Sequence, residues 1–355
     1  MNDDLSRGGY APIEMGTKAW SSSGSNGARP AEVSTPDIKV GLTAVVLSVR
    51  QEQPVVLVVG ASRVWDSQDL AQLPTGGFSP LKQPSLEAAL REVVGRVAGR
   101  ELGFLEQLLT DYTSGEAPVG LVGTSAASLN GRHDASQLSV SYLALARTDA
   151  AALSPGANWL DVYALLPWED FRSGKPQVLV DRILPGLETW AARDGDGPFC
   201  DGDTAMSRAE RFQIAFGMGG RSWDDQHVVD RLDLIVEAEL VLQEAQVRLS
   251  PAQLRLVAAA LGRLRGKIRY RPVVFELLPP EFTLFELQRT VEAVLGPTLH
   301  KQNFRRLVEG TGLVEPTGEI RNNTGGRPAK TFRFRREVLL ERPAPGVHVR
   351  PGRAA

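Results

Sequence analysis

The chain has 355 residues, with 40 Lys and Arg against 42 Asp and Glu and a formal net charge of −2. No apolar run approaches the ~18 residues that span a bilayer, the first residues lack the pattern of a secretory signal, and one cysteine excludes an intrachain disulfide and a cysteine-based zinc site. These features predict a cytoplasmic protein without a membrane partner or a metal, long enough for two or three domains.

The first predicted elements are two strands that follow an N-terminal segment without predicted structure. Residues 1–37 are rich in Gly, Ser, Pro and Ala, and residues 341–355 have a similar composition, so both segments are predicted to be disordered. Between 40 and 60, two apolar and β-branched runs flank a polar stretch, which predicts a hairpin of buried strands. The Pro-Thr-Gly-Gly sequence at 74–77 predicts a turn.

A helix and further strands complete the first predicted domain. Ser85 is a suitable N-cap for a helix over 86–102, whose apolar residues recur at three- and four-residue spacing. Strands are predicted around 120–124 and 138–147, and another helix over 177–192. This order of elements predicts an α+β domain over 38–192.

The next predicted region, 193–265, is a polar, glycine-rich linker followed by connecting helices. Two Asp residues fall in the first turn of a helix predicted over 223–247, where they suit the helix dipole. Ser250 and Pro251 predict the start of another helix that runs to about Arg265. We expect these long helices to make the protein a homodimer.

The segment from Phe282 to Arg336 predicts two short helices and a basic hairpin. Thr283 and Glu286 have the spacing of a capping box, which predicts a helix over 284–295 that ends at a Gly-Pro pair. A second helix is predicted over 299–309, ending at Gly310. Its buried side would consist of Leu299, Phe304 and Leu307. Its exposed side would carry Lys301, Gln302, Arg305 and also Asn303 and Arg306, which are residue types that read bases or bind phosphates.

The hairpin that follows concentrates positive charge. Its long tip, 322–328, carries Arg327 and is followed by Lys330, as in a wing that reaches phosphates or the minor groove. From Thr298 to Arg336 there are nine Lys and Arg against three Glu, whereas residues 1–297 have 28 basic and 37 acidic residues. This asymmetry predicts that double-stranded DNA binds a winged helix-turn-helix domain at 266–340. RNA binding and a solvated basic face without a partner remain the alternatives.

The helix predicted over 86–102 carries part of the Nudix signature, G-x5-E-x7-R-E-U-x-E-E-x-G-U, in which U is a bulky apolar residue. Gly77 opens the match, and Arg91-Glu92-Val93 stands where R-E-U belongs. The replaced acidic positions are Gln83, Gly95 and Arg96. Nudix hydrolysis needs divalent cations held mainly by these carboxylates. With Glu92 alone remaining, we expect no metal, no catalytic residue and no hydrolysis.

A degenerate domain of this kind joined to a winged helix resembles the Nudix-related transcriptional regulators of NAD metabolism, of the NrtR and NadQ types. The winged-helix resemblance rests on FTLFELQRTVEAVLG, KQNFRRLVEGTGLVEPTGE and GGRPAKTFRF. The segments LPTGGFSPLKQPSLEAALREVVG and WLDVYALLPWEDFR of the first domain are more similar to the NadQ branch. Over 38–340, the resemblance implies a Nudix-like α/β/α sandwich, a helical connector and a winged helix.

The resemblance also implies a function and its partners. It implies a homodimeric, nucleoid-associated repressor whose operators lie upstream of NAD synthesis or salvage genes. The effector would be a nucleotide such as ADP-ribose, ATP or an NAD-related compound, and no cofactor is implied. Carried onto matching positions, the DNA-contacting candidates are Lys301, Gln302, Asn303, Arg305, Arg306, Arg327 and Lys330.

The sensor domain offers no clear ligand motif, so its candidates come from the surroundings of the signature. They are Gly76, Gly77 and Phe78, with Arg91 and Arg96, although Arg91 is also spaced to pair with Glu87. Two other functions compete with the repressor. One is a Nudix-type nucleoside diphosphate hydrolase with an accessory basic module, and the other is a scaffold that binds a nucleotide but no DNA.

Overall fold

The computed structural model describes most of the chain from residue 38 onwards. The described residues are 38–60, 71–99, 102–113, 136–148, 153–193, 206–240, 249–321, 328–341 and 346–347. The N-terminal segment 1–37, the strand predicted at 120–124 and the glycine-rich part of the linker lie outside them.

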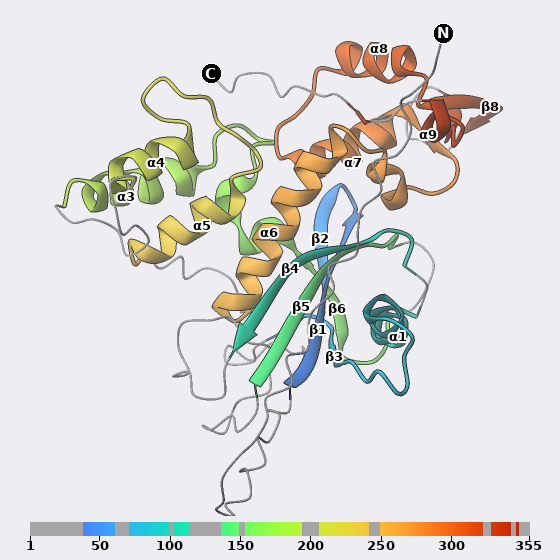
Figure 1. The fold of residues 1–355 in the computed structure, drawn as a ribbon. Helices are drawn as coiled ribbons and strands as arrows, with labels where there is room; N and C mark the ends of the chain where they lie inside the picture. Colours follow the sequence, from blue (N-terminus) through green and yellow to red (C-terminus); the bar gives the residue numbers. More distant parts are fainter. Residues whose placement is uncertain are drawn as a thin grey trace, which may run out of the picture. The chain divides into compact units, whose positions relative to one another are not determined.

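A mixed sheet occupies the centre of the first domain (Figure 1). Its strands are β1 (Ile38–Arg50), β2 (Gln53–Val59), β3 (Thr75–Gly77), β4 (Leu105–Thr113), β5 (Ser136–Leu145) and β6 (Ala157–Asp161). The order is β4-β5-β1-β2-β6, and β3 also pairs with β1. β1 and β5 are parallel, whereas the other pairs are antiparallel. The hairpin predicted between 40 and 60 is confirmed as β1 and β2.

The two faces of this sheet are covered by different parts of the chain, because side chains alternate along a strand. Ala44 and Val46 of β1 belong to the core beneath α1 (Leu86–Ala98). Val45 and Leu47 belong to the larger core, which also contains residues of α6 (Pro251–Ile268) and α7 (Leu284–Leu295). Figure 1 shows α1 on one side of the sheet and α6 on the other. The second helical layer therefore includes helices of the connector and the winged helix, packed in one core with Val162 and Tyr163 of α2 (Val162–Leu165).

The helices between β6 and α6 differ in part from the prediction. They are α2 (Val162–Leu165), η1 (Pro167–Glu169), the π-helical turn η2 (Leu179–Ile183), α3 (Leu184–Ala191), α4 (Arg208–Phe216) and α5 (Val228–Glu237). The helix predicted over 177–192 is confirmed as η2 and α3. The prediction over 223–247 is wrong at its start, because Asp224 accepts the amide hydrogen of Gln226 (2.9 Å) in a turn that precedes α5, and α5 ends at Glu237.

The connector also holds a helix that the sequence analysis missed. α4 begins with a capping box in which Ser207 caps and Glu210 reaches back, a spacing visible in the sequence as Ser-x-x-Glu. The predicted start of α6 is confirmed, since Ser250 Oγ accepts from Gln253 N at 3.3 Å. The helix extends to Ile268, beyond the predicted end at Arg265. Among the described residues, no helix combines the length and apolar character that a bilayer crossing requires.

The C-terminal module is a helix pair with a small sheet. After the short helix η3 (Val273–Leu277) come β7 (Phe282–Thr283), α7, α8 (Lys301–Thr311), β8 (Val314–Arg321), β9 (Ala329–Phe334) and α9 (Val338–Glu341). The sheet has the order β7-β9-β8. Part of the predicted disordered tail is ordered, because Val347 is buried and its amide donates to Ile268 O (2.9 Å) at the end of α6.

Candidate nucleic-acid interface and nucleotide site

The capping box that opens the helix pair has the predicted geometry. Thr283 Oγ1 accepts from Glu286 N at 3.2 Å, and the Glu286 carboxylate accepts from Thr283 N at 2.7 Å. α8 ends at Gly312 (φ 62°) rather than at Gly310, so the predicted end is wrong by two residues. Either glycine suits a left-handed position. Ending at Gly312 places Leu313 in the core, fully buried, and this packing decides between them.

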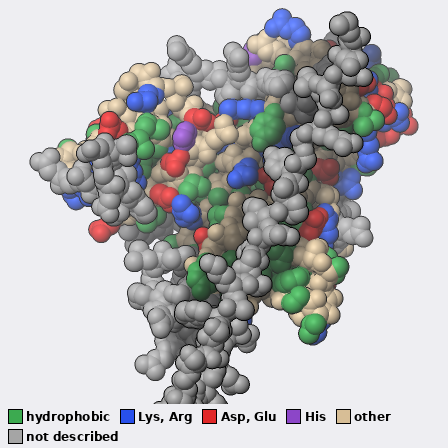
Figure 2. Space-filling view, viewed as in Figure 1, with side chains coloured by type: hydrophobic (Ala, Val, Ile, Leu, Met, Phe, Trp, Pro, Cys, Tyr) green, Lys and Arg blue, Asp and Glu red, His purple; other side chains and the backbone are tan. Residues whose placement is uncertain are grey.

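The outer face of α8 presents the predicted DNA-contacting side chains to solvent. Phe304 and Val308 are the buried residues of the helix. Its exposed residues include Lys301, Gln302, Asn303, Arg305 and Arg306. In Figure 2, Lys and Arg side chains project from the surface over α8. The helix therefore offers cations and amides on one face while apolar residues hold its other face.

Few of these side chains are committed to protein partners. Arg305 Nε lies 3.3 Å from Glu309 Oε1, and both side chains are about half exposed. Arg306 Nη2 donates weakly to Asn303 Oδ1 at 3.4 Å. Exposed pairs of this kind contribute little to stability. Both arginines are therefore available to an anionic partner.

The wing uses part of its positive charge internally. Arg321 binds Glu286 at 2.7 Å, Arg333 binds Glu315 at 2.6 Å, and Arg335 donates to Gly312 O at 3.0 Å. Lys330 is exposed on β9, opposite Ile320. Arg327 lies outside the described residues. Within the described residues no carboxylate pairs with Lys301, Arg306, Lys330 or Arg336.

The carboxylate of Glu92 in α1, which survives from the signature, accepts a hydrogen bond from Gln83. Gln83 stands in place of the first Glu, and its amide donates to Glu92 Oε2 at 3.2 Å. The Gln83 carbonyl oxygen accepts from Ser79 N at 2.9 Å, which fixes the direction of the amide. Among the described residues, no three His, Cys, Asp or Glu side chains gather in a way that fits a metal ion.

The five ligand candidates divide into the backbone segment 76–78 and two arginines of α1. Gly76 packs on α1, where an added Cβ would collide with Val93, and Phe78 N donates to Val40 O at 2.9 Å. Gly77 pairs with Gly41 of β1, so this segment is fixed against both the sheet and the helix. Arg91 binds Glu87 at 2.9 Å and the carbonyl of Leu102, which confirms the predicted pair and gives Arg91 a structural role. Arg96 is exposed near the end of α1.

A groove of about 520 Å³ lies elsewhere, between β4, α5 and α6, and none of the predicted site residues lines it. Its two arginines are already paired, Arg255 with Asp233 and Arg263 with Glu106. Because these guanidinium groups are neutralised and the groove is open, we do not assign the nucleotide to it.

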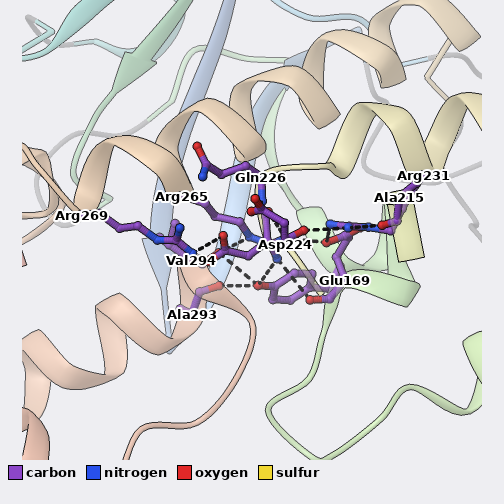
Figure 3. A network of polar contacts seen from close by, with 11 residues as sticks. Glu169, Ala215, Asp224, Gln226, Arg231, Arg265, Arg269, Ala293 and Val294 are labelled. Atoms are coloured by element: carbon purple, nitrogen blue, oxygen red, sulfur yellow. Dashed lines mark hydrogen bonds and ion pairs between the residues drawn. The ribbon is translucent and has the colours of Figure 1, made fainter. Parts of the chain in front are cut away.

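A cluster of buried charges, which no local sequence pattern predicts, lies where η1, α5 and α6 meet the C-terminal end of α7. The Glu169 carboxylate has no exposed surface and binds Arg231 Nε at 2.6 Å and Arg265 Nη1 (Figure 3). Burial by itself raises the pKa of Glu169, but the two guanidinium groups outweigh it and hold the pKa below the ordinary value. The cluster joins positions 62 and 96 residues apart, which no local pattern reveals.

The guanidinium groups of this cluster also bind backbone carbonyls of several elements. Arg231 donates to Ala215 O at 2.9 Å and to Asp224 O at 2.8 Å. Arg265 donates to Val294 O at 2.9 Å and to Asp225 O at 3.1 Å. Figure 3 shows these donors converging from α5 and α6 on Glu169. The cluster thus joins the first domain, the connector and the C-terminal end of α7.

Comparison with known proteins identifies the C-terminal module. Residues 274–334 match the family described as the NrtR DNA-binding winged helix domain. These residues are thus similar to an NrtR-type winged helix. Over 75 residues the chain is 44% identical to a protein of Acinetobacter baylyi (strain ATCC 33305 / BD413 / ADP1) described as "ADPR responsive transcriptional repressor NtrR". That match covers 21% of this chain and 30% of the relative's length.

Solved structures extend the likeness beyond the NrtR-type winged helix. Shewanella oneidensis NrtR complexed with a 27mer DNA has a TM-score of 0.51 at 19% identity, covering 85% of this chain and 95% of that chain. The NUDIX domain of the same protein with ADP ribose covers 39% of this chain at 19% identity, with a TM-score of 0.27. The first comparison confirms the fold as a Nudix-like domain followed by a winged helix. The similarity to the NadQ branch stays a prediction.

Proposed function

We propose that this protein is a transcriptional repressor of NAD biosynthesis or salvage genes. The observation that carries the proposal is the exposed face of α8, on which Lys301, Arg305 and Arg306 lie in an NrtR-type DNA-binding domain. A helix of this kind places base-reading side chains in the major groove, while the wing contacts the backbone. A homodimer would place two such helices on half-sites one turn of DNA apart.

The proposed effector is a nucleotide bound at the Nudix-like domain, with ADP-ribose first because a relative that is 44% identical over 75 residues is described as responsive to it. Gly76, Gly77 and Phe78 would provide backbone contacts, and the exposed Arg96 would meet a phosphate. Arg91 remains a candidate only if it leaves Glu87. ATP and NAD-related compounds are the alternative effectors.

We further propose that the Nudix-like domain does not hydrolyse its ligand. Two acidic positions of the signature are held by Gly95 and Arg96, and the remaining Glu92 accepts a hydrogen bond from Gln83. One carboxylate beside a cation is a poor site for the divalent ions of Nudix chemistry. An assay with ADP-ribose or NADH and Mg²⁺ should give no turnover. Turnover that Glu92→Gln abolishes would instead establish the hydrolase.

An electrophoretic mobility assay tests the repressor directly. The probe is the DNA upstream of the protein's own gene, with a shuffled duplex of equal length as control. We expect selective retardation of the upstream DNA. It should weaken steeply as the salt concentration rises, because Lys and Arg side chains that bind phosphates displace counterions from the DNA. Adding ADP-ribose, ATP or NAD in separate lanes identifies the effector as the compound that changes the retardation. Equal retardation of both duplexes at every salt concentration would contradict sequence-specific repression.

A further inference from the structure

The last turn of α7 is capped by residues from outside its own domain. The last carbonyls of a helix have no partner within it. Here the hydroxyl of Tyr163, in α2 of the sensor domain, donates to Ala293 O at 2.8 Å, and Arg265 of α6 donates to Val294 O at 2.9 Å. Burial raises the pKa of Tyr163 to about 12, so its hydroxyl remains a donor at neutral pH. The end of α7 thus depends on the sensor domain for its hydrogen bonds.

The turn after α7 is also fitted against the buried cluster. Gly296 has φ 99°, a conformation that suits glycine, and an added Cβ would lie 2.6 Å from Glu169 O and 3.6 Å from Tyr163 Oη. The chain passes directly from this turn to α8. A change in the position of Tyr163 or Glu169 therefore acts at the point where α8 is set relative to α7.

The start of α8 is fixed by a second set of contacts that reaches the same helix. Glu292, which is 2% exposed, accepts the amide hydrogen of Leu299 at 2.8 Å. Gln288 donates to Leu299 O at 2.9 Å. Because Leu299 precedes α8 by two residues, the direction of α8 is tied to α7 rather than to the wing alone. Moving α7 would therefore move the face that carries Arg305 and Arg306.

Tyr163 is also linked, through Arg172, to a strained turn of the sensor sheet. Gln51 and Glu52, between β1 and β2, have φ of 50° and 63°, a conformation that Gly, Asn and Asp adopt more readily. Arg172 donates to Glu52 O at 2.6 Å, and its guanidinium lies 5.0 Å from the centre of the Tyr163 ring. Arg289 of α7 forms a longer ion pair with Glu52 at 3.5 Å. The turn is therefore linked to α7 directly through Arg289 and to Tyr163 through Arg172.

The chain of β6 and α2 contributes side chains to both faces of the sheet. Trp159 of β6 packs against the core beneath α1, on the face where we place the nucleotide. Four residues later, Tyr163 lies in the core on the opposite face, with α6 and α7. A ligand that shifts β6 from the α1 side would move Tyr163 by direct chain connection.

We propose that Tyr163, held by Arg265, is the positioning residue through which nucleotide binding at the sensor sheet changes the placement of α8. The inference rests on the proposed function, since it needs both DNA and an effector. Tyr163 contacts neither of them and acts through α7.

The test compares Tyr163→Phe with wild type and with Tyr270→Phe, a half-exposed tyrosine at the end of α6. For each protein, the DNA dissociation constant is measured without and with saturating ADP-ribose, and calorimetry of ADP-ribose binding defines saturation. Tyr163→Phe retains the ring and loses the bond to α7. We consider the case in which that bond is made either only with ADP-ribose or only without it. The ratio of the DNA dissociation constants with and without ADP-ribose should then move toward one by about fivefold, the worth of one hydrogen bond. Tyr270→Phe should keep the wild-type ratio.

The outcomes separate the two ideas. A wild type whose DNA binding ignores ADP-ribose, ATP and NAD would overturn the proposed function and this inference with it. A responsive wild type with an equally responsive Tyr163→Phe would overturn the inference alone. Hydrogen exchange of wild type, which needs no variant, provides the second measurement. ADP-ribose should change protection at residues 293–304, and unchanged protection there would also overturn the inference.

Discussion

Arginine has opposite roles in the buried cluster and on α8. Arg231 and Arg265 are 0% and 1% exposed, and each binds Glu169 and backbone carbonyls. Arg305 and Arg306 are exposed and have only weak contacts within their own helix. Burial and partners, not residue type, therefore decide what a guanidinium group does. A dehydrated arginine must keep its partners, whereas a hydrated one can exchange water for phosphate.

The largest expected effect is on the buried side. Glu169→Gln removes the negative charge between two buried guanidinium groups, and we expect a loss of about 3–5 kcal/mol in the free energy of unfolding. Glu309→Gln is the matched control, because it removes the carboxylate of an exposed arginine. Urea titration of both variants gives the difference. Equal stability of the two variants would remove the distinction between buried and exposed arginines.

Acid should narrow the difference in stability between wild type and Glu169→Gln. The pKa of Glu169 is lower in the folded protein than its ordinary value, because Arg231 and Arg265 outweigh burial. Its contribution is therefore fully present at neutral pH and is lost as pH falls through the folded pKa, below the ordinary value of about 4.3. Wild type should lose stability faster than Glu169→Gln over that acidic range. Parallel curves of stability against pH would contradict the assigned ion pairs.

On the exposed side, the expected effect is on DNA rather than on folding. Replacing both Arg305 and Arg306 by Ala should weaken operator binding by about 1–3 kcal/mol for each base-reading arginine. The free energy of unfolding should stay within about 0.5 kcal/mol of wild type, since surface substitutions rarely change it by more. Fluorescence anisotropy with a labelled operator measures the affinity. Unchanged affinity would exclude α8 as the recognition helix.

A smaller effect distinguishes phosphate contacts from base contacts. Lys301 lies in the first turn of α8, where a cation suits the DNA backbone, so Lys301→Ala should weaken specific and non-specific duplexes alike. The slope of log affinity against log salt should fall by about one. Lys39, a basic residue on β1, provides the control. A loss confined to the specific duplex would assign Lys301 to base reading instead.

The smallest expected effect concerns Glu309, which faces Arg305 at 3.3 Å. Glu309→Gln should change stability by less than about 0.5 kcal/mol, because exposed pairs contribute little. The same change should raise DNA affinity a few-fold, since it frees Arg305 and removes a negative charge near the phosphates. The anisotropy assay used for the arginine variants measures this. Lower affinity would show that Glu309 orients Arg305 rather than competing for it.

Local patterns predicted the winged helix well because its determinants are close in sequence. Thr283 and Glu286 are three residues apart, and the apolar spacing in α8 placed Phe304 inside and the cations outside. The charge count was less informative than it first suggests. Arg321, Arg333 and Arg335 contribute to the positive total but bind Glu286, Glu315 and Gly312 within the module. Only the structure separates cations that hold the domain from those offered to a partner.

The sequence by itself determined the hairpin of β1 and β2, the capping box of α7, the missing signature carboxylates at Gln83, Gly95 and Arg96, and the basic face of α8, because each depends on neighbours within a few residues. Tertiary structure decided how these parts are joined. It placed α6 and α7 on the open face of the sheet, and it brought Tyr163 and Glu169 to the end of α7. An apolar face can be covered by any apolar helix, and a buried charge can find its partner at any sequence separation. Only the packed chain fixes which helix and which partner are used.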